Sequence, residues 1–142
     1  NNTGRQQGNG AGTNTAGLFF SGYQDRSSPN FPGITESWNG TSWTEVSDLN
    51  TGRTTSGGGG TQTSAISCGG ATGPSSTPTA NTELWDGTSW TEVADLATAR
   101  EQIRGAGTNK LAFAAGGATP GTVHDATEEW TTTHTLKKVT TS

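Results

Sequence analysis

The sequence predicts an all-β fold, a partial β-propeller of three four-stranded blades, and three observations lead to this prediction. A segment rich in Trp, Thr and Glu recurs almost letter for letter, and its copies lie at residues 35–46, 82–93 and, in a degraded form, 127–133. The matching tryptophans, Trp38, Trp85 and Trp130, are 47 and 45 residues apart, a period in the range of propeller blades. No long segment carries apolar residues at helical spacing.

The composition fits thin β-sheets joined by many tight turns better than it fits a disordered chain. Only 27% of the residues are apolar and 22 of 142 are glycine, yet charged residues make up just 14% and the net charge is −4. Disordered chains carry a high net charge and lack regularly spaced aromatic residues. The length suffices for one ordinary domain.

Composition also excludes several classes of function. Eight basic residues in an acidic chain argue against a nucleic-acid partner, and no apolar run is long enough for membrane insertion. Cys68 is the only cysteine, so the chain forms neither an internal disulfide nor a cysteine metal cluster, and the redox compartment stays open. The sequence has no Met and no visible signal peptide, so we expect a processed product or the ordered part of something longer.

Each repeated unit is expected to contain four strands, and the units span residues 1–49, 50–96 and 97–142. The first strand is dense in glycine, which suits an inner position where another backbone comes close. The second is apolar and ends in glycine. Its aligned residues two apart, such as Leu18 and Phe20, leave the same face. The third strand carries Thr-Glu-x-Trp and the fourth Trp-Thr-Glu-Val, replaced in the last unit by a cap strand at 136–139.

The third and fourth strands are predicted to form a hairpin. Asn39-Gly40 and Asp86-Gly87 separate short segments rich in Trp, Thr and Val, which suit pleated strands. These dipeptides supply the positive φ angles of a tight turn.

The segments between the second and third strands vary in length, and we expect them to be loops on a binding face. They lie at 23–33, 71–80 and 118–125. Aromatic and Arg side chains are favoured as interface anchors, although aromatic residues in a loop equally pack it onto its own blade. The candidate ligand-binding residues are Tyr23, Gln24, Asp25, Arg26 and Phe31 in the longest loop, and His124 and Asp125 in the third. A plain exposed loop pair is the alternative for His124-Asp125.

Two sets of recurring residues are interpreted as structural. Arg5, Arg53 and Arg100 open the three units at equivalent positions, which favours hydrogen bonding within the blade over substrate binding. Aromatic faces suit pyranose rings, but tryptophans at a fixed position in each blade favour burial. These tryptophans are Trp38, Trp43, Trp85, Trp90 and Trp130.

With these residues in view, the chain resembles the kelch repeat family, including the kelch-like repeats of the galactose oxidase propeller, over essentially its whole length. The matching features are the Arg that opens each unit, the Gly-Gly that closes its second strand and the Trp that begins its outer strand. The Tyr that commonly precedes the Trp is missing, since Ser37, Leu84 and Glu129 stand there. The wording Trp-Asn-Gly-Thr-Ser-Trp-Thr-Glu-Val is also similar to repeat tracts of bacteriophage virion and tail-fibre proteins.

The kelch resemblance implies a closed ring, which three blades cannot form. Open sheet edges invite pairing, so we expect other copies of the chain, or an upstream part of a longer one, to complete the propeller. Two three-bladed chains would give six blades.

Enzymatic function is not expected, and no cofactor or metal is predicted. Neither His124 nor His134 has neighbours at metal-ligand spacing, and a copper-radical oxidase of the galactose oxidase type needs a tyrosine pair, whereas Tyr23 is the only tyrosine. The leading hypothesis is a structural or adhesin module of a virion appendage, such as a tail fibre, with loops that present a surface to a host glycan or protein. The expected location is the virion or the outside of the cell. The alternatives are a cellular or secreted kelch-type interaction scaffold and a secreted carbohydrate-active enzyme.

Overall fold

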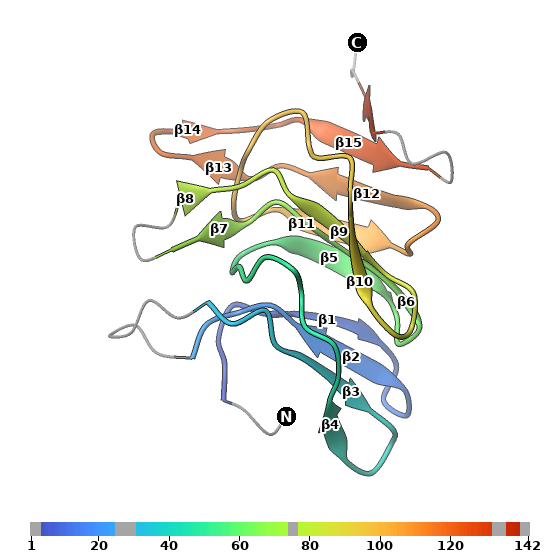
Figure 1. Ribbon diagram of the computed structural model, residues 1–142. Helices are drawn as coiled ribbons and strands as arrows, with labels where there is room; N and C mark the ends of the chain where they lie inside the picture. Colours follow the sequence, from blue (N-terminus) through green and yellow to red (C-terminus); the bar gives the residue numbers. More distant parts are fainter. Residues whose placement is uncertain (1–3, 25–30, 74–76, 132–135, 140–142) are drawn as a thin grey trace.

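The computed structural model describes residues 4–24, 31–73, 77–131 and 136–139, and within them the chain is all-β, as predicted. Three four-stranded antiparallel sheets lie one over another, and two short hairpins extend from one end of the stack (Figure 1). No helix in the described part of the chain could cross a membrane.

The three sheets share one strand order, which follows the chain from the inner to the outer strand. Sheet 1 contains β1 (Asn9–Gly12), β2 (Gly17–Phe20), β3 (Thr35–Trp38) and β4 (Trp43–Glu45). Sheet 2 contains β5 (Gly57–Thr61), β6 (Ser64–Cys68), β9 (Thr82–Trp85) and β10 (Trp90–Val93). Sheet 3 contains β11 (Arg104–Gly107), β12 (Ala112–Ala115), β15 (Thr127–Trp130) and β16 (Leu136–Val139).

Two of the segments expected to be loops instead contain short hairpins. They consist of β7 (Ala71–Thr72) with β8 (Thr77–Pro78) and β13 (Ala118–Thr119) with β14 (Thr122–Val123). Strands of two residues are too short to show alternation in the sequence, which is why the pattern missed them.

The glycines of the inner strands allow the close backbone approach that the sequence predicted. Strand β5 lies against both β1 and β11 (Figure 1). A Cβ atom at Gly59 would be 3.0 Å from Cα of Ala106, and one at Gly58 would be 3.1 Å from the ring of Phe20. A side chain at either position would require the neighbouring atoms to shift.

The core lies between the sheets. Leu18 and Phe20 share one face of β2, as predicted, and pack against Trp85 and Trp90 of sheet 2. The rings of Phe20 and Trp90 have centroids 4.9 Å apart. The opposite face of sheet 2 packs in the same way against sheet 3, where Ile66 and Leu84 contact Ala112 and Trp130.

The predicted hairpins are present, but their turns are built differently. Trp38 pairs with Trp43 and Trp85 with Trp90, so four residues form each turn. Only the glycine of each dipeptide has a positive φ, 91° at Gly40 and 100° at Gly87. The Asn39 side chain instead accepts hydrogen bonds from the N–H groups two and three residues ahead, and Asp86 does the same. These bonds lower the pKa of Asp86, the one from Ser89 contributing most.

Cys68 lies in the core between sheets 2 and 3, and burial raises the pKa of its thiol from 9.0 to about 12. Between these pH values the unfolded chain loses a proton that the folded chain keeps, so stability falls as pH rises. We expect this loss to be roughly 1 kcal/mol per pH unit. Urea unfolding from pH 9 to 11 should therefore show a shallower fall for Cys68→Ala than for the parent chain. Parallel curves would contradict the expectation.

Candidate ligand-binding face

The described parts of the variable segments and the starts of the inner strands lie at the same end of the stack, which we call the loop face. Three isolated bridges connect them at equivalent places. Gln6 pairs with Tyr23, Thr54 with Ala71 and Glu101 with Ala118. The hairpins β7–β8 and β13–β14 project from this end (Figure 1). The loop face therefore brings together the segments that differ most in length between repeats and the residues that precede the inner strands.

The residue after each bridge has a left-handed backbone. The φ angle is 58° at Gln7, 52° at Thr55 and 57° at Gln102. This conformation is uncommon outside glycine and is an outlier for a β-branched residue such as Thr. It costs about 1–3 kcal/mol per residue and persists only where the surroundings hold it. One such residue lies two positions before the inner strand of each sheet, so backbone strain recurs on the loop face.

Hydrogen bonds between sheets hold part of this strained backbone. The Thr55 N–H donates to the Gln7 carbonyl over 3.2 Å. The Thr54 hydroxyl lies 3.3 Å from the same carbonyl and 3.0 Å from Oε1 of Gln7. These contacts fix Gln7 relative to sheet 2.

The three strained residues line one polar depression of about 330 Å³. Its lining consists of Gln7, Gly8, Asn9, Thr55, Ser56, Gln102 and Arg104. The Asn9 amide is already committed, since its Nδ2 lies 2.7 Å from the Ser56 carbonyl and 2.8 Å from Oγ of Ser56. The side chains of Gln102 and Arg104 are exposed, and neither makes a hydrogen bond or ion pair with another described residue.

The depression can bind a ligand through amide and hydroxyl groups and one guanidinium. No carboxylate is among its lining residues, so it suits a hydroxyl-rich ligand or one that carries a negative charge. Sequence reasoning missed Gln7, Thr55 and Gln102. Each of them lies two residues after a recurring Arg, and this spacing could have marked them. Their residue types, however, do not indicate a left-handed backbone.

The predicted loop candidates differ in what they offer a ligand. Tyr23 is only 7% exposed, and its ring centroid lies 6.1 Å from that of the half-buried Phe31, so this pair packs the loop onto its sheet. Gln24 is exposed. Asp25 and Arg26 lie outside the described residues.

The third variable segment ends in the predicted histidine pair. His124 is half-buried, with Nε2 3.1 Å from the Thr119 hydroxyl, and Asp125 is exposed. The hydrogen bond connects β13 to the residue that directly follows β14, which gives His124 a structural role. Within the described residues, no three His, Cys, Asp or Glu side chains are grouped so that they could hold a metal ion.

The three recurring arginines form buried ion pairs with a glutamate of their own sheet. Arg5 lies 2.7 Å from Glu36 and Arg100 lies 2.7 Å from Glu128. Arg53 pairs with Glu83, and burial lowers the pKa of Arg53 although that carboxylate opposes the shift. The arginines were predicted from the sequence, but their glutamate partners were not. Each glutamate is the second residue of the repeated Thr-Glu-x-Trp strand, so its recurrence in the sequence could have identified it as the partner.

The recurring tryptophans differ in burial according to their sheet. Trp85, Trp90 and Trp130 are at most 5% exposed, whereas Trp38 and Trp43 of sheet 1 are half-buried. Each indole N–H of Trp38, Trp85 and Trp130 donates to the turn that follows the inner strand of its own sheet. Their equivalent bonds indicate a shared structural role, and the extra exposure in sheet 1 follows from its place at the end of the stack.

Comparison with known proteins adds no assignment, because no protein-family model and no curated protein sequence matches the chain.

Proposed function

We propose that the chain is a segment of a kelch-like β-propeller that serves as a non-enzymatic structural and adhesive module of a virion appendage. Its partners would be further copies of the chain, or further units of a longer one, and a host-surface receptor. The repeat wording supports the virion setting, and the shared strand order of the three stacked sheets supports the propeller.

The observation that carries the binding role is the polar depression on the loop face. Strained residues that precede the inner strands of all three sheets converge there, and the side chains of Gln102 and Arg104 are exposed without a partner among the described residues. Amide and guanidinium groups without a protein partner bind hydroxyl and carboxylate groups of a ligand well. We therefore propose a glycan with an acidic sugar as the ligand, held in the depression and flanked by the variable segments.

The lining favours binding over catalysis. Its amide, hydroxyl and guanidinium groups orient a ligand, while general acid–base catalysis usually relies on imidazole or carboxyl groups, which the lining does not include. This contrast supports an adhesin rather than a carbohydrate-active enzyme.

A glycan array that includes neutral and acidic oligosaccharides tests the binding role. We expect retention of acidic glycans, and about a tenfold or greater loss of affinity in Arg104→Ala, since a hydrogen bond to a charged group contributes about 1.5–3 kcal/mol. Gln102→Ala should weaken binding of both acidic and neutral members. The matched control is Lys110→Ala, which removes an exposed cation from the turn at the opposite end of β11.

Equal retention by all three variants and the parent chain would exclude the depression as the binding site. The virion setting has a separate test. Mass spectrometry of purified particles should detect this polypeptide, and its absence from particles alongside its presence in host cells would favour the cellular scaffold.

A further inference from the structure

The outer faces of sheet 1 and sheet 3 each carry a mainly apolar groove. On sheet 1, the outer face carries a groove of about 400 Å³, and the residues that we call the Trp face are Gly17, Phe19, Trp38 and Trp43. On sheet 3, the outer face carries a groove of about 360 Å³, and the residues that we call the Phe face are Ala106, Leu111, Phe113 and Glu129.

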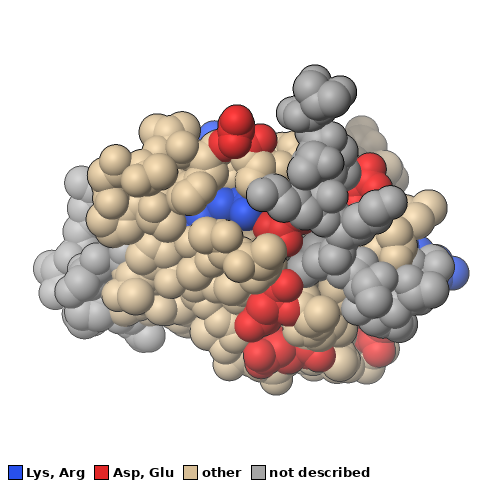
Figure 2. Space-filling model, turned by 90° about the horizontal axis from the view of Figure 1, so that it is seen from above, with Lys and Arg blue, Asp and Glu red and all other residues tan. Residues whose placement is uncertain are grey.

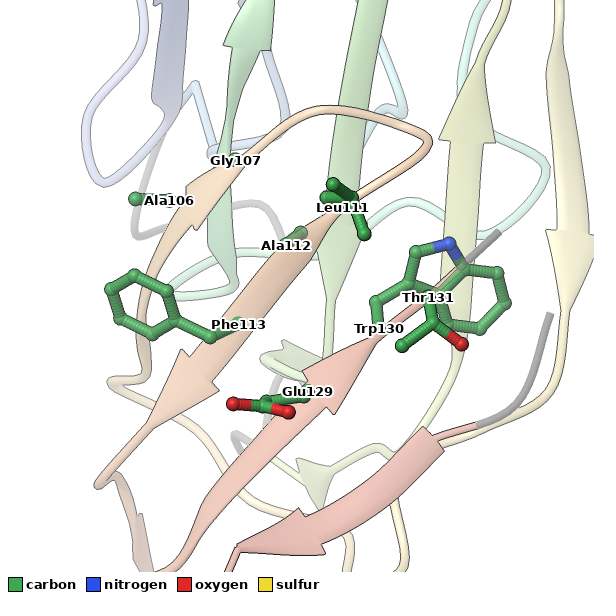
Figure 3. A pocket seen from close by; sticks show the side chains of 8 residues that line it. All are labelled: Ala106, Gly107, Leu111, Ala112, Phe113, Glu129, Trp130 and Thr131. Atoms are coloured by element: carbon green, nitrogen blue, oxygen red, sulfur yellow. The ribbon is translucent and has the colours of Figure 1, made fainter. Parts of the chain in front are cut away.

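The Phe face exposes large apolar side chains, although the equivalent face of sheet 2 is buried against sheet 3. Phe113 is 46% exposed and Leu111 is 64% exposed, whereas Ile66, at the position of Phe113 in sheet 2, is 3% exposed. Figure 3 shows the side chains of Phe113 and Glu129 next to each other on β12 and β15, with Leu111 where the chain enters β12. Figure 2 looks down on this end of the stack, where uncharged residues cover most of the described surface and acidic residues form a band across its middle.

Sheet 2 shows what covers each kind of face. Its Trp85 and Trp90 occupy the positions of Trp38 and Trp43, and they pack against Leu18 and Phe20 of sheet 1. Its other face carries Ile66, which packs against Ala112 and Trp130 of sheet 3. The Trp face and the Phe face are thus the two halves of an interface that the molecule already makes twice.

We propose that the Phe face of one copy binds the Trp face of a second copy, head to tail, in the geometry of the internal interfaces. This inference deepens the self-association named in the proposed function and needs no ligand. The partner is a second copy of this chain because each face is one half of the interface that joins neighbouring sheets within the chain. Two copies joined at both ends would form a closed ring of six four-stranded sheets.

The side-chain sizes of the two faces complement each other. At the internal interfaces, Leu18 clusters with Ala65, and Ile66 clusters with Ala112. Gly17 pairs with Trp38 as Ala65 and Ala112 pair with Trp85 and Trp130, so it stands at their position. The head-to-tail contact would therefore place the large Phe113 ring opposite glycine rather than alanine. Compared with the internal interfaces, the side chain on the Phe face is larger and the residue opposite it on the Trp face is smaller.

The polar groups of the two faces also correspond. Nε2 of Gln62 in sheet 2 donates to Oγ of Ser37 over 2.9 Å and to the Trp38 carbonyl over 2.7 Å. Asn109 of sheet 3 repeats the second bond, since its Nδ2 lies 2.9 Å from the Trp85 carbonyl.

The residue at this turn position in sheet 1 is Asn14, whose side chain makes no hydrogen bond with another described residue. In the head-to-tail contact its amide would donate to Glu129, which stands at the position of Ser37, and to the Trp130 carbonyl of the other copy. That bond gives the single carboxylate of the Phe face a donor at the rim of the contact.

Light scattering during size-exclusion chromatography tests the inference. We expect the parent chain to have twice its 14.5 kDa mass and Phe113→Arg to have the single mass. Phe113 is half-exposed, so its replacement should leave the fold intact, which circular dichroism verifies. The matched control is Val123→Arg, because Val123 is 86% exposed but lies on the β13–β14 hairpin. This control should keep the double mass.

A mixing experiment tests the head-to-tail geometry itself. Phe113→Arg keeps an intact Trp face and Trp43→Lys keeps an intact Phe face, so a mixture of the two should form a pair while each alone stays single. A single mass for the parent chain, or a double mass for Phe113→Arg, would overturn the inference. Glycan binding by the Phe113→Arg variant, whose loop face is untouched, reports on the proposed function independently.

Discussion

Replacing Glu83 by Ala should destabilise the fold by about 3–5 kcal/mol, the range observed when one partner of a buried ion pair is removed. The Glu83 carboxylate is fully buried and pairs with Arg53. It also accepts hydrogen bonds from the Asn50 N–H at 2.7 Å and the Thr51 N–H at 3.1 Å. The substitution leaves the Arg53 guanidinium buried without a counter-charge and removes the acceptor that holds the connection between sheets 1 and 2.

Urea unfolding of purified variants measures this cost. The matched control is Glu45→Ala, which removes an exposed glutamate from β4 and should change stability by about 0.5 kcal/mol or less. Replacing both partners, in Arg53→Met with Glu83→Leu, should recover much of the loss because no unpaired charge then remains buried. An equal cost for Glu83→Ala and Glu45→Ala would show that the ion pair does not stabilise the sheet.

Replacing Trp90 by Ala should cost about 3–5 kcal/mol, the range for truncating a large aromatic residue in a core. Trp90 is 5% exposed, packs on Phe20, and donates its indole N–H to the Thr35 hydroxyl over 2.9 Å. It therefore joins sheet 2 to sheet 1 by both packing and a buried hydrogen bond. Its loss would leave a cavity between the sheets and the Thr35 hydroxyl without this donor.

The matched control is Trp43→Ala, which truncates the same strand position in sheet 1. Trp43 is half-buried, so its replacement should cost less than half as much as that of Trp90. Both variants are best compared in the Phe113→Arg background, where a second copy does not cover Trp43. Equal costs in that background would contradict the assignment of Trp90, and not Trp43, to an internal interface.

Much of the fold could be predicted because the same residue pattern occurs three times in the sequence. Alternation in Leu18 and Phe20 identified a buried face, and the glycines near Gly58 identified a close approach between backbones. The hairpins at Asn39 and Asp86 were found, although the turns use side-chain acceptors that the dipeptide alone does not reveal. The short strands of the variable segments left no periodic trace.

The candidate site was harder to predict because it depends on backbone conformation and on neighbours far apart in the chain. The length of its loop made Tyr23 a predicted binding residue, yet its ring is buried beside Phe31. The polar depression instead gathers Gln7, Thr55 and Gln102, which have unlike side chains and share only a left-handed backbone. Repeated spacing marked these positions, but only the fold places them side by side.

The most direct test of the head-to-tail contact is a crystal structure of the self-associated protein. We predict that Trp38 and Trp43 of one copy contact Phe113 of the next copy as Trp85 and Trp90 contact Leu18 and Phe20 within one chain. A structure in which the Trp face and the Phe face both lie in solvent, or contact surfaces unlike the internal ones, would contradict it.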